Sequence, residues 1–549
     1  MSENMKNEKD TGCARMTGRS ATLGDMDLAK AYLRPDAANA VQLIEADGGE
    51  AELRLQLRGY VSGDEDENSP SATDAIAAHL FKHLRGSDNL AFAGARQRVE
   101  IYADRLRELC EREHLPQEFY PHHASLSREH RDFVERRLKD AAKPTTAVCT
   151  STLELGIDIG DVTCVAQIGA PFSVAALRQR LGRSGRREGQ PAVLRQYVVE
   201  TQLTPESSFV DRLRLGLIRS IAMIDLLLKG WCEPPRPQAL HLSTLVHQIL
   251  SVIAQRGGAS ASVVYSILCR EGPFRKVTTE VFADVLRSIG HTETGLIEQS
   301  GSGLLLLGPA GEKLVEHYSF YAVFQTPEEF RLVAEGRELG TLPIDNVLAP
   351  GMLLIFSGRR WVVQEIHDRE KVIMVKPAKA GVPPVFGGDP GDIHDKVIDR
   401  MFAVLEGDAS PAYMDSVSLT MLEEARAQYQ LLGFRTENIH SLGEHTSIIA
   451  TRVGTVKTST LALALRSEGF SVEQHDGFLL VEAGDEAPDL QTVIDRIAAG
   501  EPVDIFAGAG NLVSEKFHPY LSHDLLALDA ASSRLAPNLL SDLASKLFQ

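Results

Sequence analysis

The chain has 549 residues, of which 43% are hydrophobic and 24% charged, as in a folded globular protein, which excludes a mostly disordered or fibrous chain. At about 150 residues per domain, this length predicts three or four domains. Lys plus Arg number 57 and Asp plus Glu 75, a formal charge of −18 that excludes a uniformly basic nucleic-acid coat but not local basic patches.

The sequence shows no apolar run of the roughly 20 residues that a membrane span needs, and its first thirty residues carry no apolar signal core. Its six cysteines are scattered, without a CxxC pair. These features predict a reduced, cytoplasmic protein without membrane contact.

Between residues 38 and 232, short apolar runs alternate with amphipathic ones. This pattern predicts a parallel sheet that helices cover on both faces. The expected strands are 89–93, 146–150 and 164–168, and the expected helices are 75–84, 99–112 and 128–139.

A proline-rich run at 232–237 predicts a linker. Three helical stretches (243–255, 260–269 and 279–289) and two extended runs (296–299 and 304–307) follow, which predict a winged-helix domain at 236–316. Strand-rich residues 317–380, with runs at 361–363 and 371–375, predict a small β-barrel. A C-terminal α+β domain is expected at 381–549, with helices at 418–432 and 458–467.

The densest chemical signal is a cluster of arginines at 178–187. Arg183 and Arg186 are three residues apart, which places both guanidinium groups on one face of a helix. Gly182 and Gly185 leave room for a partner to approach. Two planar, permanently charged groups suit the oxygens of a transferring phosphoryl group. A solvated basic turn or a generic phosphate patch is the alternative.

A second signal, at 150–158, follows an expected strand and therefore lies at the carboxyl end of a parallel sheet, where ligands bind in open α/β folds. A hydroxyl such as that of Thr150 can bond a phosphate, and Asp158 can accept a ribose hydroxyl. The alternative is an ordinary helix start that Ser151 or Thr152 caps.

Together, these segments resemble motifs V and VI of superfamily 2 helicases, which belong to the second of two RecA-like motor domains. Residues 89–96 resemble motif IV, 122–127 the HHGSLS element and 20–24 motif III, SATxG. The wording of 152–158 and 167–171 is similar to the Lhr (large helicase-related) family. The expected winged helix, residues 320–324, the barrel and residues 461–466 fit the core of that family.

The resemblance implies a role for each matching residue. Arg183 and Arg186 would be arginine fingers at the γ-phosphate of ATP, and Gln179 and Arg180 would couple the ATP cleft to the nucleic-acid groove. The implied ATP-binding residues are Asp158, Gly156, Gln179 and Arg180. The implied nucleic-acid contacts are Thr150, Ser125, Arg96 and Trp361, and Gly156 would also contact a strand phosphate. Trp361 is equally well explained as barrel core. Ser20 and Thr22 would couple hydrolysis to domain movement.

The family resemblance also implies ATP and Mg²⁺ as cofactors, and translocation in the 3′ to 5′ direction on single-stranded DNA or an RNA–DNA hybrid. The printed sequence contains neither a P-loop, GxxxxGKS/T, nor a DExH box. We therefore expect residues 1–37 to be a remnant of the first RecA-like domain, and the chain alone to bind single strands without hydrolysing ATP. A non-hydrolysing binding module, a half that a separate P-loop chain completes, or a truncated fragment are the alternatives. No metal site is expected at His122 and His123.

Overall fold

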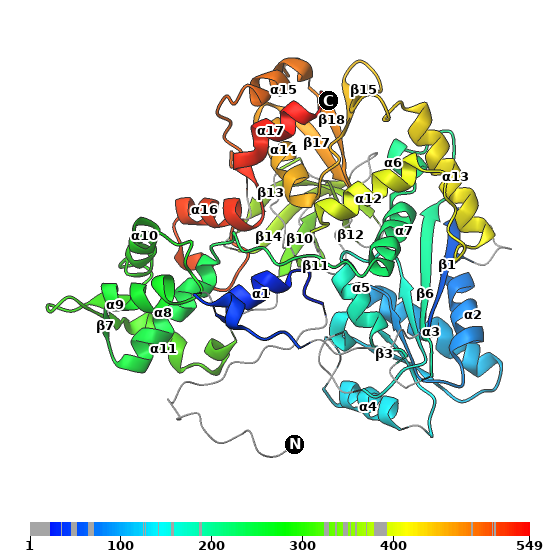
Figure 1. The fold of residues 1–549 in the computed structure, drawn as a ribbon, viewed down its shortest axis with the longest axis horizontal. Coiled ribbons are helices and arrows are strands. Elements are labelled where there is room, and N and C mark those ends of the chain that lie inside the picture. Colours follow the sequence, from blue (N-terminus) through cyan, green and yellow to red (C-terminus); the bar gives the residue numbers. More distant parts are fainter. Residues whose placement is uncertain are drawn as a thin grey trace.

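The structure is a computed structural model (Figure 1). It describes residues 22–34, 36–44, 52–63, 71–124, 126, 128–140, 142–154, 159–185, 189–322, 329–334, 337–343, 350–351, 353–356, 359–368, 370–377, 392–484, 487–507, 509 and 512–548. Among these residues, no helix combines the length and apolar character that crossing a membrane requires.

The largest sheet has six strands in the order β1-β6-β5-β2-β4-β3, and every neighbouring pair is parallel. The strands are β1 (Leu53–Ser62), β2 (Asn89–Phe92), β3 (Phe119–His122), β4 (Thr146–Cys149), β5 (Cys164–Ile168) and β6 (Ala192–Thr201). The helices of this part are α2 (Ala72–Leu84), α3 (Arg96–Arg112), α4 (Arg128–Lys139), α5 (Val174–Leu181), α6 (Phe209–Leu213) and α7 (Leu215–Leu228).

Alternating side chains place a separate core on each face of this sheet. In β2, Leu90 and Phe92 enter the core that α4, α5 and α7 cover, whereas Ala91 enters the core beneath α2 and α3. The expected doubly covered parallel α/β sheet is therefore confirmed. The long strands β1 and β6 were not among the expected elements.

A second group of elements, which we call the three-helix module, spans residues 242–316. Its three main helical stretches are α8 (Leu242–Arg256), α9 (Ala261–Tyr265) with a π-helical turn at Ser266–Arg270, and α10 (Thr279–Ile289). A short fourth helix, α11 (Pro309–Glu316), and a sheet of β7 (Ala259–Ser260), β9 (Leu304–Leu307) and β8 (Ile297–Gln299) complete it. Phe282, Val285 and Ile289 face its core, at helical spacing. The helices and hairpin match the expected positions, and the winged-helix assignment stays a prediction.

A five-stranded sheet follows, in the order β11-β10-β14-β13-β12. Its strands are β10 (Glu329–Ala334), β11 (Arg337–Pro343), β12 (Leu353–Phe356), β13 (Arg359–His367) and β14 (Val372–Pro377). In the part of the chain that the structure describes, the end strands β11 and β12 are not paired with each other. Closure into a barrel therefore stays a prediction.

The last part of the chain contains a four-stranded antiparallel sheet in the order β15-β16-β18-β17. Its elements are α12 (Asp395–Glu406), α13 (Ser416–Leu431), β15 (Ile439–Ser441), β16 (Thr446–Ala450), α14 (Thr455–Ser467), β17 (Phe470–His475), β18 (Phe478–Ala483), α15 (Leu490–Ala498), α16 (His523–Ser533) and α17 (Leu540–Lys546).

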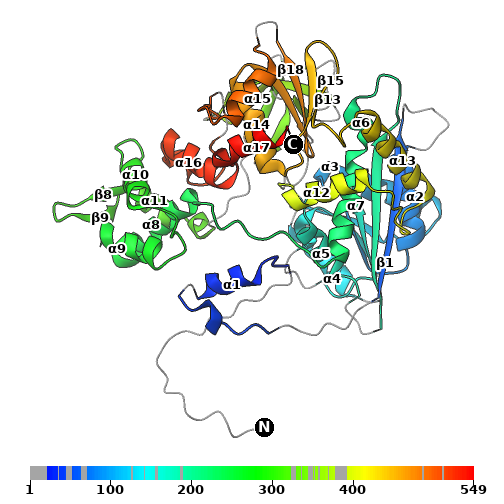
Figure 2. The same ribbon diagram turned by 45° about the horizontal axis from the view of Figure 1, so that its top comes forward.

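This C-terminal part joins two other cores. Helices α12 and α13 lie along α7 and β1, and their apolar residues share a core with the six-stranded sheet (Figure 2). At the sheet edge, Leu57 N donates to Tyr413 O (2.8 Å) and Asp415 N donates to Leu57 O (3.0 Å). Farther along, α16 packs into the core of the three-helix module through Leu525 and Leu526.

The carboxyl group of Glu200, near the end of β6, lies against the first turn of α7. The Glu200 carboxylate accepts a hydrogen bond from Leu217 N (2.8 Å) in the first turn of α7. Burial raises the pKa of Glu200 from 4.5 to about 7, although Arg214 and Arg219 oppose this shift. Arg214 itself holds Glu424 of α13 at 2.8 Å.

We expect Glu200→Gln to change how stability depends on pH. The pKa of Glu200 in the folded state lies above the usual 4.5, so the protonated group contributes its full stabilisation below pH 4.5. This stabilisation is lost as the pH rises through about 7. Relative to the variant, the wild-type free energy of unfolding should therefore fall by up to about 3 kcal/mol between pH 5 and 8. Urea denaturation measures this, with exposed Glu206→Gln as control. A difference that stays constant with pH contradicts the assignment.

Candidate nucleotide and nucleic-acid interface

Helix α5 starts at the carboxyl edge of the six-stranded sheet and carries the first part of the arginine-rich segment. It starts after β5, where the Ser173 hydroxyl accepts a hydrogen bond from Ala176 N (3.1 Å). It ends at Gly182, whose N–H donates to Arg178 O (2.8 Å). After its last turn, which carries Gln179 and Arg180, the chain reaches the amino end of β5, where Val162 N donates to Arg183 O (3.2 Å).

Arg180 is buried and occupies the centre of a hydrogen-bonded network. Its Nε and Nη2 donate to Glu154 Oε2 (2.8 and 2.7 Å), and its Nη1 donates to Gln167 Oε1 (2.6 Å). Its guanidinium group also lies 4.7 Å from the centroid of the Phe92 ring. One side chain thus joins the segments after β4, in β5 and in β2. The ATP-binding role of Arg180 stays a prediction.

Arg183 lies in a turn that is fixed on both sides. Its Nη2 donates to Glu154 O (2.9 Å), so the side chain reaches toward the same segment as Arg180. The next hydroxyl, Ser184 Oγ, donates to Thr163 O (2.8 Å) and accepts from Val193 N (3.1 Å). Arg186, the second expected finger, lies outside the described residues.

Gly185 is required by this turn. Its φ is +71°, and a Cβ atom there would lie 2.7 Å from Ala192 N. A larger residue would meet both the left-handed backbone and this contact. The glycine therefore fixes the direction in which the chain leaves Arg183.

Gln179 contacts the N-terminal segment. Its Nε2 donates to Thr22 Oγ1 at 2.7 Å, although the two residues are 157 positions apart in the sequence. Thr22 precedes α1 (Met26–Leu33), which Asp25 caps through Leu28 N (2.9 Å). The structure therefore brings together Gln179 and Thr22, for which the motif resemblance implies two separate coupling roles, and both roles stay predictions. Ser20 lies outside the described residues.

The expected nucleic-acid contacts are only partly described. Thr150 ends β4, and its N–H donates to His122 O (3.3 Å). Arg96 opens α3 at the carboxyl end of β2, so both residues lie at the same edge of the sheet. Ser125, Gly156 and Asp158 lie outside the described residues.

Trp361 lies far from these residues in the fold. It is 8% exposed and packs with Phe330 and Val363 in the core of the five-stranded sheet. This burial favours the alternative that it is a core residue, and its role in base stacking stays a prediction.

The histidine pair at the end of β3 joins neighbouring elements. His122 Nδ1 lies 2.8 Å from Thr152 Oγ1, and its Nε2 lies 3.3 Å from Glu135 Oε1 in α4. His123 Nε2 lies 2.7 Å from Glu100 Oε1 in α3. Burial lowers the pKa of His122, although Glu135 opposes this shift. The pair therefore holds the segment after β4 against two helices.

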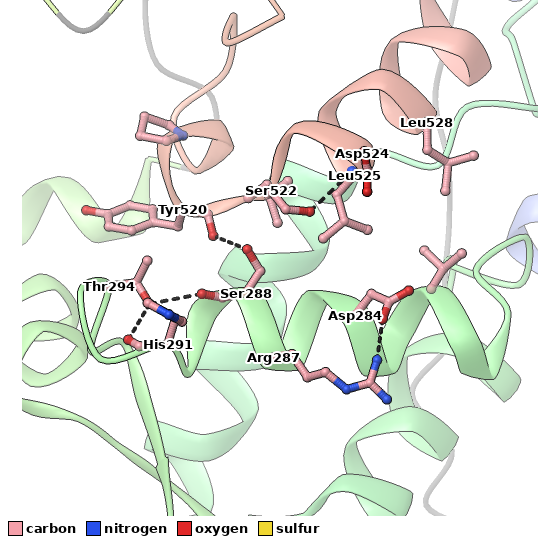
Figure 3. A pocket seen from close by; sticks show the side chains of 13 residues that line it. Asp284, Arg287, Ser288, His291, Thr294, Tyr520, Ser522, Asp524, Leu525 and Leu528 are labelled. Atoms are coloured by element: carbon pink, nitrogen blue, oxygen red, sulfur yellow. Dashed lines mark hydrogen bonds and ion pairs between the residues drawn. The ribbon is translucent and has the colours of Figure 1, made fainter.

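A cavity of about 560 Å³ lies between α10 and the segment that leads into α16 (Figure 3). Ser288 Oγ donates to Tyr520 O (2.8 Å) across it, and Asp284 forms an ion pair with Arg287 beside it. The outward face of α10 thus adjoins α16 and carries both signs of charge. This arrangement disfavours insertion of α10 into a DNA groove.

Glu515, His518 and Asp529 bring three potential metal ligands together. However, His518 Nδ1 accepts hydrogen bonds from Ser514 N and Glu515 N (both 3.2 Å). The proton of the neutral ring then lies on Nε2, 3.1 Å from Asp529 Oδ2, and leaves this nitrogen no lone pair for a metal. The cluster is explained by hydrogen bonds that hold α16 in place.

The sequence did not predict several contacts of this site. Glu154 and Gln167 hold Arg180, and Glu233 holds the start of α5, but none of them was singled out. A carboxylate that pairs with an arginine 26 residues away leaves no local pattern. The one available signal was the isolated acidic residue between the hydroxyl-rich run and Gly156.

Residues 72–188 match the family described as helicase conserved C-terminal domain. Two curated relatives are the Lhr helicase/uracil glycosylase of Escherichia coli, 24% identical over 316 residues (52% of this chain, 19% of the relative), and the ATP-dependent helicase Lhr-Core of Methanocaldococcus jannaschii, 43% identical over 122 residues (21% of this chain, 14% of the relative). The chain thus spans about a fifth or less of the length of these relatives.

A similar solved structure is that of the Mycobacterium smegmatis helicase Lhr bound to ssDNA and AMP-PNP. It has a TM-score of 0.61 and 19% identity, and the alignment covers 96% of this chain and 70% of that one. This likeness shows a shared fold.

The six-stranded parallel sheet, with the matched residues along it, defines the C-terminal RecA-like domain of a helicase. The relatives that the chain resembles are helicases of the Lhr type.

Arg180→Ala should destabilise the fold strongly. The truncation leaves the Glu154 carboxylate and the Gln167 amide oxygen buried without their donor, which typically costs about 3–5 kcal/mol. The matched control is exposed Arg178→Ala, two residues away on the same helix, for which we expect a loss below about 1 kcal/mol. Chemical denaturation of the three proteins measures the difference. Equal losses would show that the network does not hold the sheet edge.

Proposed function

We propose that this chain provides the second motor domain and accessory domains of an Lhr-type ATP-dependent helicase or translocase. It binds single-stranded DNA, or an RNA–DNA hybrid, and moves along it in the 3′ to 5′ direction. Arg183 and Arg186 supply positive charge to the γ-phosphate of ATP, which a domain with a P-loop and a DExH box holds on the opposite side of the cleft.

The contact between Gln179 and Thr22 carries this proposal. A hydrogen bond of 2.7 Å joins α5, the helix that precedes the expected fingers, to the segment that resembles motif III. A link of this kind lets phosphate-dependent movement of one segment reach the other.

The described residues fit one side of a nucleotide site. The Arg183 guanidinium group is a permanent donor that suits phosphate oxygens. The neighbouring carboxylate, Glu154, is held by Arg180 (2.7 Å), so it serves the network rather than Mg²⁺. Bound ATP would supply the free energy for movement, and Arg183 would stabilise the charge that develops on its phosphates.

The alternative is a module that binds nucleic acid without hydrolysis, or one half of a motor that docks on a separate chain. The printed sequence favours it, because neither phosphate-binding motif occurs in it. A P-loop domain restores turnover to the motor and to the half motor, but not to a module that only binds nucleic acid.

We expect the purified chain alone to hydrolyse ATP no faster than its Arg183→Ala variant, with or without single-stranded DNA. Adding a separate first RecA-like domain of an Lhr relative should restore DNA-stimulated turnover. In that mixture, Arg183→Ala should lower kcat about 10³-fold or more, as removal of an arginine finger does, whereas exposed Arg136→Ala should not. Restored turnover that Arg183→Ala leaves unchanged would refute the finger assignment. No restoration would favour the binding module.

Binding to a fluorescent oligo(dT) should weaken as salt concentration rises, because phosphate contacts release counterions. Arg96→Ala should flatten the slope of log K against log salt by about 0.7, which is the loss of one single-strand phosphate contact. Arg112→Ala, at the opposite end of α3, serves as control. Fluorescence anisotropy between 50 and 300 mM salt, roughly the range in which such slopes are resolved, measures both. A salt-independent complex would contradict the binding assignment.

A further inference from the structure

The chain that connects α7 to the three-helix module contacts the site at two points. We call its residues 230–233 the linker clasp. They follow the last turn of α7 and precede the proline-rich run that leads into α8. The described part of the clasp touches both α5 and the segment of Thr22.

Glu233 in the clasp binds the first turn of α5. Its Oε1 accepts a hydrogen bond from Val174 N (2.7 Å), and its Oε2 accepts one from Ala175 N (2.9 Å). With the Ser173 hydroxyl, it satisfies the three N–H groups that the helix itself leaves unpaired at this end. An anion here also interacts favourably with the helix dipole. The position of α5 therefore depends on a residue 59 positions away in sequence.

The clasp also contacts the second half of α5 and the segment of Thr22. Arg178 Nη1 donates to Gly230 O (3.3 Å) and lies 3.7 Å from Cys232 Sγ. On the other side, a Cβ atom on Gly24 would lie 2.3 Å from Cys232 O, so the backbone of the Thr22 segment passes directly against the clasp. Residues close in sequence to both partners in the Gln179–Thr22 contact, namely Arg178 and Gly24, thus lie against the clasp.

Beyond the clasp, the linker is attached to the C-terminal part of the chain. Pro234, Pro235 and Pro237 stiffen it. Arg236 Nη1 binds Asp392 Oδ2 (2.7 Å), and at the start of α8 Leu242 N donates to Asp529 Oδ1 (3.0 Å). A displacement of the three-helix module therefore passes along a short, stiff segment to Glu233.

We propose that Glu233 is a positioning residue that couples nucleic-acid occupancy of the three-helix module to the placement of α5 and its side chains Gln179, Arg180 and Arg183. The inference rests on the proposed function, because it needs a nucleic acid that contacts the module. Binding shifts the module, the shift moves the Glu233 carboxylate, and α5 follows through the two backbone hydrogen bonds.

Hydrogen–deuterium exchange of the full chain, with and without oligo(dT), tests this coupling. In wild type, oligo(dT) should change exchange over residues 174–183. Glu233→Ala should raise basal exchange of the Val174 and Ala175 amides about tenfold and abolish their response to DNA. Glu233→Gln, which keeps one acceptor oxygen, should retain part of the response. Exposed Glu206→Ala is the control, and thermal unfolding confirms that each variant is folded.

Anisotropy on the same samples separates the possible failures. If wild type binds oligo(dT) and residues 174–183 do not respond, or if Glu233→Ala responds as wild type does, the coupling is refuted while the proposed function stands. If wild type does not bind oligo(dT), the proposed function fails and the coupling fails with it. A response that Glu233→Ala removes and Glu233→Gln partly restores, at unchanged affinity, supports the inference.

Discussion

The buried network around Arg180 is the interaction on which the site depends. A single guanidinium group fills the space between three strand ends and satisfies a carboxylate, an amide oxygen and an aromatic face. In such a low-dielectric position each partner is costly to leave unpaired, so the strand ends keep one relative arrangement. Arg183 follows in the same segment of the chain. Its Nη2 donates to Glu154 O, so the side chain is held by a residue of the same network.

The sequence pattern predicted elements whose signal is local. Helices α4 and α10 and strand β5 have the expected bounds, because their apolar spacing and flanking turn residues lie within a few positions of one another. The parallel sheet itself followed from the alternation of these elements. The edge strand β1 was missed because its alternating polar residues are explained only by its partners, β6 and the segment around Tyr413.

For the candidate site, the sequence offered candidate residues but did not indicate which other residues hold them in place. The arginine cluster and Thr22 were identified from motif wording, and the structure brings Gln179 to Thr22. The supporting residues Glu154, Gln167 and Glu233 were missed, since each acts on a residue that only the fold makes its neighbour. Trp361 is a different case. A tryptophan suggests stacking on a nucleic-acid base, but the packing of its strand favours a role in the core.

The shared core of α7, α12 and α13 bears on how the chain is divided. Residues such as Ile221, Met401 and Leu422 pack together, although the three-helix module and the five-stranded sheet lie between them in sequence. The core of the six-stranded sheet thus contains residues of α7 and of the later helices α12 and α13. A fragment cut after residue 232 would expose the apolar face of α7 to water. Removal of residues 236–380 would in turn expose Leu525 and Leu526 of α16, which pack into the core of the three-helix module.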